Sequence, residues 1–197
     1  MMDMFRNLSA ALLLTLLLSP AAMADDAQDQ QVESGLAALK SKDFPEAIRI
    51  LLPLAVEGNA EAQFQIGLMY YKGDGLPKDR CVGIVWLEKA GRQAHARAAL
   101  MTGFTFYFGG GVKKSHELAY RWASFAHKLG HSQAKDQMFV FGHDLPQDKK
   151  DAIDRDMETW NPAQLPQTEY FFIDGSSLQP LDYYRKFVKR TGMFPCR

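Results

Sequence analysis

The chain has 197 residues, with 23 basic and 23 acidic side chains and a formal net charge of zero. This balance argues against a nucleic-acid-binding protein, which usually carries a basic surplus. The length suffices for one domain with a hydrophobic core.

Residues 1–24 have the composition of a cleavable export signal. Arg6 supplies a positive start, residues 8–18 are apolar, and Ala22-Met23-Ala24 fits the small-x-small pattern of a cleavage site. The apolar run is shorter than the roughly 20 residues of a membrane-spanning helix, so a retained anchor is the less favoured alternative. No cysteine follows the run, which argues against a lipid anchor. We predict cleavage after Ala24 and a periplasmic or secreted protein.

The segment after the export signal changes from polar to periodic. Residues 25–31 are acidic and polar, and we expect a flexible lead-in there. Helical spacing begins at Val32, and Lys42-Asp43 predicts a tight turn. Residues 44–57 carry apolar side chains at i, i+3, i+4 and i+7, which indicates a second helix that Gly58 ends.

The middle of the chain repeats itself at an offset of 36 residues. The matching pairs are Ala62 and Ala98, Gly67 and Gly103, Tyr71 and Tyr107, Gly73 and Gly109, and Trp86 and Trp122. Many matches at one offset indicate stacked copies of one supersecondary unit, which is a solenoid. The pattern predicts helices over 60–72, 78–90, 96–108 and 115–129, a third copy that opens at 132–141, and a closing helix at 146–160.

The residues of the first copy match a known repeat. The pattern is Ala62-x-x-x-Ile66-Gly67-x-x-Tyr70-x-x-Gly73-x-Gly75-Leu76-x-x-Asp79, followed by Trp86-x-x-Lys89-Ala90. It resembles the Sel1-like repeat, an αα-hairpin related to tetratricopeptide repeats, over residues 32–142. Three positions depart from the family pattern: Gly83, where the family has Ala, Thr102, where it prefers Leu, and His127, where a small residue is usual. A glycine inside an exposed helix costs about 1 kcal/mol.

The resemblance implies the fold and the class of function. We expect an all-α protein, with a short right-handed α-solenoid of αα-hairpins over residues 32–162 and a non-repeat tail over 163–197. The family implies a non-catalytic adaptor or scaffold that binds another envelope or secreted protein. An envelope enzyme, such as a hydrolase, or a small-ligand-binding protein acting on cell-wall material is an alternative.

Apparent catalytic motifs in the repeats are better explained as structure. The run 109–115 superficially resembles a phosphate loop, but no glycine directly precedes the Lys-Ser pair and a helix comes before it. His116-Glu117 begins like a zincin helix but lacks a histidine at i+4. His95 and His131 occupy one repeat position, which favours a cap or turn role. We predict no catalytic residue, metal or cofactor.

Aromatic residues on the first helices of the hairpins are the candidates for binding. These helices line the concave side of such solenoids, where exposed aromatic side chains anchor partners. The candidates are Leu68, Tyr71, Met101, Phe104, Tyr107 and Phe108. Alternatively, Phe104 and Phe108 pack against the C-terminal tail.

The tail carries three further hypotheses. The apolar run at 170–173 is either a strand or an extended segment, and 181–191 is an amphipathic helix candidate with a basic face. That helix, within 181–197, could dock on an anionic membrane surface. Cys81 and Cys196 either form a disulfide, which would tie the tail to the solenoid, or remain separate thiols.

Overall fold

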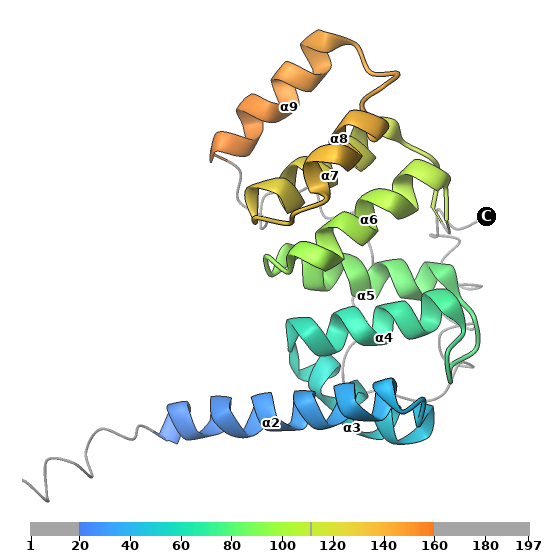
Figure 1. Cartoon of the computed structure of the whole chain (residues 1–197), viewed down its shortest axis with the longest axis vertical. Helices are drawn as coiled ribbons and strands as arrows, with labels where there is room; N and C mark the ends of the chain where they lie inside the picture. Colours follow the sequence, from blue (N-terminus) through green and yellow to red (C-terminus); the bar gives the residue numbers. More distant parts are fainter. Residues whose placement is uncertain (1–19, 111, 160–197) are drawn as a thin grey trace, which may run out of the picture. The chain divides into compact units, whose positions relative to one another are not determined.

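The computed structural model describes residues 20–110 and 112–159. These residues form helices and no strand, in agreement with the predicted all-α fold (Figure 1). The helices are α2 (Pro20–Lys40), α3 (Phe44–Glu57), α4 (Ala60–Lys72), α5 (Arg80–Arg92), α6 (Ala96–Phe108), α7 (His116–Lys128), α8 (Ala134–Phe141) and α9 (Gln147–Thr159). None of the described helices is long and apolar enough to cross a membrane. The predicted tail at 163–197 and most of the predicted export signal lie outside the described residues.

The chain divides into two compact units, residues 1–50 and 51–197. In the first unit, α2 ends in a tight turn at Lys42, whose φ is +61°. The backbone N–H of Asp43 donates to the carbonyl oxygen of Ala38 at 2.9 Å, and Asp43 Oδ1 accepts from the N–H of Glu46 at 3.2 Å. These bonds close α2 and cap α3, so the predicted turn is confirmed.

The expectation of a flexible lead-in over residues 25–31 was wrong, because α2 includes that segment. Alanine and glutamine, which favour helices, make up much of it. Once the turns around Val32 and Ala38, both buried, have formed, each added residue gains a backbone hydrogen bond without a new nucleation cost. The predicted cleavage position after Ala24 falls inside this helix, and cleavage itself stays a prediction.

The second unit contains two αα-hairpins whose first helices have the same length. α4 and α6 have the predicted bounds and thirteen residues each. Each ends at a glycine in the left-handed region, Gly73 with φ +90° and Gly109 with φ +72°. Residues with a side chain are disfavoured at such angles, so these glycines fix where the chain reverses. The glycine loop at 109–115 is therefore a helix cap, and Ser115 caps α7 in turn.

The two helices of the first hairpin touch at a pair of glycines. A Cβ atom at Gly83 would lie 2.8 Å from the carbonyl oxygen of Gly67 and 2.9 Å from the backbone nitrogen of Tyr71. Gly83 is buried, so the cost expected for an exposed helical glycine does not describe this position. The glycine lets α4 and α5 approach more closely than an alanine would. Thr102, a second departure, is buried and donates its hydroxyl to the carbonyl oxygen of Ala98 at 2.9 Å.

The hairpins stack into a solenoid. α5 packs against both α4 and α6, and α7 packs against α6, α8 and α9 (Figure 1). The third copy is truncated, since α8 has eight residues where α4 and α6 have thirteen. α9 closes the core with Ile153 and Met157, which are buried with Trp122 and Phe141.

Candidate functional site

The structure divides the six predicted binding residues into three groups. Leu68 and Met101 are half-buried and pack against the core cluster around Phe64 and Leu87. Tyr71 lies apart from them, with the Arg80 guanidinium 5.4 Å from its ring centre. The remaining three residues form an aromatic stack on α6.

That stack contains Phe104, Tyr107 and Phe108, and it rests on Phe141 of α8. The rings of Phe104 and Phe108 are parallel within 5°, with centres 6.2 Å apart. Phe104 meets Phe141 edge-on at 5.1 Å, and Tyr107 stacks on Phe141 at 4.8 Å. Phe108 is 69% exposed, although its ring also meets Tyr107 at 5.1 Å. Neighbouring rings thus hold an exposed aromatic side chain in a fixed position.

α8 exposes two apolar residues that the sequence analysis missed. Phe139 is 78% exposed and Val140 is 42% exposed. Phe139 occupies the repeat position of Gly67 and Gly103, the residues that let the first helix approach its hairpin partner. Because Phe139 is exposed, α8 presents this repeat position to solvent rather than to a hairpin partner, and α9 packs on α7. Extending the 36-residue register by one copy shows, from the sequence alone, that Phe139 stands where the earlier copies have glycine.

Of the loops that follow α4 and α6, the second contacts the C-terminal end of α4. A Cβ atom at Gly110 would lie 2.6 Å from the hydroxyl of Tyr71, so the second loop contacts the end of α4. At the end of α6, Tyr107 stacks on His116 at 5.1 Å, and the Lys114 ammonium lies 5.5 Å from its ring centre. Figure 1 shows both loops on the right of the helix stack.

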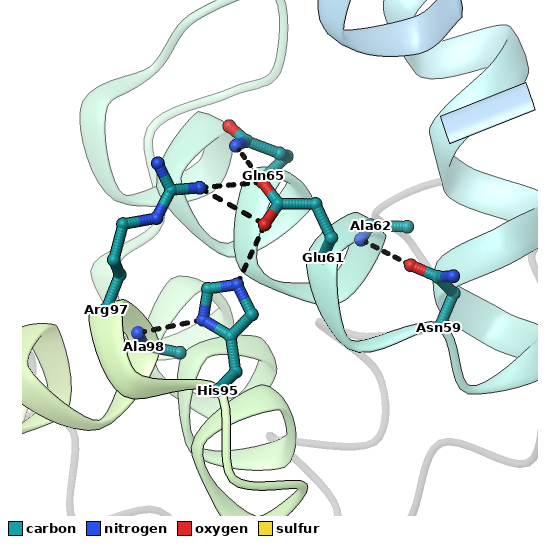
Figure 2. A network of polar contacts seen from close by, with 7 residues as sticks. All are labelled: Asn59, Glu61, Ala62, Gln65, His95, Arg97 and Ala98. Atoms are coloured by element: carbon teal, nitrogen blue, oxygen red, sulfur yellow. Dashed lines mark hydrogen bonds and ion pairs between the residues drawn. The ribbon is translucent and has the colours of Figure 1, made fainter. Parts of the chain in front are cut away.

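A polar network joins the N-terminal ends of α4 and α6 (Figure 2). Glu61 accepts hydrogen bonds from Arg97 at 2.8 and 3.1 Å and from Gln65 at 2.6 Å. His95 Nε2 lies 2.8 Å from Glu61 Oε2, while His95 Nδ1 accepts from the N–H of Ala98 at 3.1 Å. Since Nδ1 is an acceptor, the ring proton sits on Nε2 and is donated to Glu61.

These contacts give the network a structural role. The hydrogen bond from His95, with the bond from Gln65 and the positive charge of Arg97, lowers the pKa of Glu61 to about 2 against the opposing effect of burial. Glu61 and Arg97 occupy the same position in consecutive repeats, so the pair ties one repeat to the next. Opposite charges at a single repeat position are visible in the sequence and could have indicated this contact. The predicted capping role of His95 is confirmed.

Little in the described residues resembles a catalytic or metal centre. No group of three or more His, Cys, Asp or Glu side chains within 20–110 and 112–159 could hold a metal ion. His116 Nε2 is buried and has no hydrogen-bond partner in the described residues. Cys81 lies in the first turn of α5, and Cys196 lies outside the described residues, so their pairing stays a prediction.

The comparisons with known proteins agree with this architecture. The model of the Sel1 repeat matches residues 60–95 and 96–131, which are the two complete 36-residue copies. A search of curated proteins found no match.

Several solved structures are similar to the chain, and two of them are described here. One is a protective antigen present in uropathogenic Escherichia coli strains with an SLR fold, at 19% sequence identity and a TM-score of 0.63; 72% of this chain and 32% of that chain are covered. The other is a Sel1 repeat protein from Oxalobacter formigenes, at 31% identity and a TM-score of 0.56, with 65% and 53% covered. The chain thus spans about a third and about half of these proteins' lengths. Residues 60–131 thus match two Sel1 repeats, and the similar solved structures are proteins with a Sel1 repeat or an SLR fold.

Proposed function

We propose that this protein is a non-catalytic adaptor that binds another protein outside the cytosol, and that Phe108 is an anchor of the contact. Sel1 repeats generally mediate protein–protein interactions. The observation that carries the proposal is the 69% exposure of Phe108 together with its stacking on Phe104. An aromatic side chain already held in place loses little conformational entropy on binding, and such residues dominate binding energies.

Replacing Phe108 should weaken partner binding without destabilising the fold. Most of the Phe108 side chain is in solvent, so Phe108→Ala should change the free energy of unfolding by less than about 1 kcal/mol. The same change should remove an anchor that contributes about 2 kcal/mol or more to partner binding. Loss of binding with an unchanged melting temperature is the expected combination.

Site-specific photocrosslinking in the producing cell tests the contact. A photoreactive phenylalanine analogue at position 108 should give a discrete protein adduct. The matched control is the analogue at Lys135, an exposed position in the first turn of α8. Identical adducts from both positions, or no adduct from position 108, would contradict the proposal.

The cellular location has its own test. The proposed envelope or secreted location rests on the composition of residues 1–24. Cell fractionation followed by N-terminal sequencing should find the protein outside the cytosol with Asp25 as its first residue. An uncleaved chain in the cytosolic fraction would refute this part of the proposal.

A further inference from the structure

The loops that follow α4 and α6 each carry a lysine at the same repeat position. Lys78 and Lys114 are 36 residues apart. The Cβ atom of Lys78 lies 3.0 Å from where a Cβ atom of Gly73 would be, and that of Lys114 lies 3.5 Å from the same point at Gly109. Both lysines therefore lie against the glycine that ends the preceding helix.

The backbone of each loop is anchored in the same way. The N–H of Asp79 donates to the carbonyl oxygen of Tyr70 at 2.9 Å, and the N–H of Ser115 donates to that of Phe106, also at 2.9 Å. Each bond ties the end of its loop back to the preceding helix. The lysines thus project from ordered backbone, which lowers the entropy lost when they engage a partner.

These loops concentrate positive charge beside aromatic rings. We define the loop edge as Tyr71, Lys72, Lys78, Arg80, Tyr107, Phe108, Lys113 and Lys114. All its basic side chains are exposed. Among the described residues, no carboxylate forms an ion pair within 4.0 Å with any of them. Their charge is consequently available to a binding partner.

Nearby acidic groups are largely engaged elsewhere. Asp79 Oδ1 accepts from the N–H groups of Cys81 and Val82 as the cap of α5. Asp144 lies 2.9 Å from His143, a contact that, with weaker effects from His116 and Lys114, lowers its pKa. Asp74 is half-buried in the first loop and offsets one positive charge. The loop edge is therefore positive although the chain as a whole is neutral.

We propose that the loop edge binds an acidic segment of the partner protein, with a hydrophobic side chain of that segment packed on Phe108. This inference rests on the proposed function and specifies the chemistry of the partner. Carboxylates complement the exposed cations of the loop edge, and charge complementarity sets orientation and association rate. Phe108 adjoins this charge through Tyr107, which contacts both Phe108 and Lys114.

Selection of random peptides displayed on phage tests the proposal directly. Selection on the full mature chain should enrich peptides with net negative charge and an aromatic or large aliphatic residue. Their affinity should fall by about tenfold or more for the double variant Lys78→Glu and Lys114→Glu, and also when the salt concentration rises beyond the physiological range. Enrichment of neutral or basic peptides, or no enrichment, overturns it.

A charge-matched control makes the result specific to this edge. Lys40→Glu with Lys135→Glu reverses two exposed lysines elsewhere, and binding should stay within about twofold of wild type. Equal losses in both double variants would overturn the proposal. Circular dichroism melts verify that both variants fold.

A second experiment tests whether the loop edge binds a lipid surface instead of a protein segment. Vesicles of phosphatidylglycerol and phosphatidylethanolamine should not bind through this edge. Vesicle binding that Lys78→Glu with Lys114→Glu abolishes, without acidic-peptide binding, overturns the proposal in favour of a membrane contact. If crosslinking at Phe108 persists unchanged in this double variant, the adaptor function stands and the loop-edge inference fails.

Discussion

Gly83→Ala should destabilise the protein, although helix propensity alone predicts that it stabilises the protein. Replacing a helical glycine by alanine ordinarily stabilises a protein by about 1 kcal/mol. At Gly83, however, the added methyl group would lie 2.8 to 3.0 Å from the carbonyl oxygen of Gly67 and from the backbone nitrogen and Cβ atom of Tyr71. None of these atoms is the end of a flexible side chain, so α4 and α5 must move apart.

Overpacking of this kind costs about 1 to 3 kcal/mol, and contact with backbone favours the upper end. After the gain in propensity is subtracted, we expect a net loss of about 1 to 2 kcal/mol. For a chain of this length that lowers the melting temperature by roughly 2 to 8 °C. Urea unfolding and thermal melts followed by circular dichroism measure both quantities.

Two further variants test whether the close contact between α4 and α5 causes the loss of stability. Lys135→Ala, on the exposed face of α8, should change stability by less than about 0.5 kcal/mol. Gly67→Ala places a methyl group 3.0 Å from the carbonyl oxygen of Gly83 and should also destabilise. Because both glycines serve one contact, their effects should not add. A Gly83→Ala protein as stable as wild type, or more stable, would refute the close-approach argument.

Three other predictions follow from the polar contacts and the cysteines. Because the pKa of Glu61 is lowered to about 2, its contribution to folding stability is complete above pH 4.5, its ordinary pKa, and is lost as the pH falls toward 2. Glu61→Gln should lower the free energy of unfolding by about 1 to 2 kcal/mol at pH 7, after allowance for partial exposure, and should make stability in urea titrations less dependent on acid pH. An unchanged dependence on pH would count against this role of Glu61. Tyr120 donates to Asp154 at 3.0 Å, so a double-mutant cycle with Tyr120→Phe and Asp154→Ala should give a coupling of about 1 kcal/mol, and zero coupling would exclude a contribution from the bond. For Cys81 and Cys196, peptide mapping without reductant should find the two peptides linked, and alkylation of both thiols would disprove the pairing.

The sequence was most informative where structure depends on local pattern. The bounds of α4 and α6 follow from the 36-residue register, and Gly73 and Gly109 end the two helices as expected. Caps and turns involve residues close in sequence, which explains this agreement. Over residues 25–31 the same reasoning failed, because polar composition was taken for flexibility although alanine and glutamine favour helix.

The candidate surface was predicted less completely. Phe104, Tyr107 and Phe108 do form one stack, but only Phe108 among the six candidates is exposed. Leu68, Met101, Phe104 and Tyr107 are partly buried against core clusters. Their helical spacing alone could not separate these cases, since exposure depends on which neighbouring helix covers each residue. The loop edge was missed for a similar reason, because its charges converge only when the second loop meets Tyr71.

The sequence by itself determined a helical repeat protein with two complete copies, because periodic apolar residues and capping glycines act within one hairpin. Tertiary structure decided the relations between hairpins. It made Gly83 a buried contact and left Phe139 exposed on α8. It also paired Glu61 with Arg97 across one repeat. These outcomes depend on distances between segments far apart in the chain, and helix packing sets those distances.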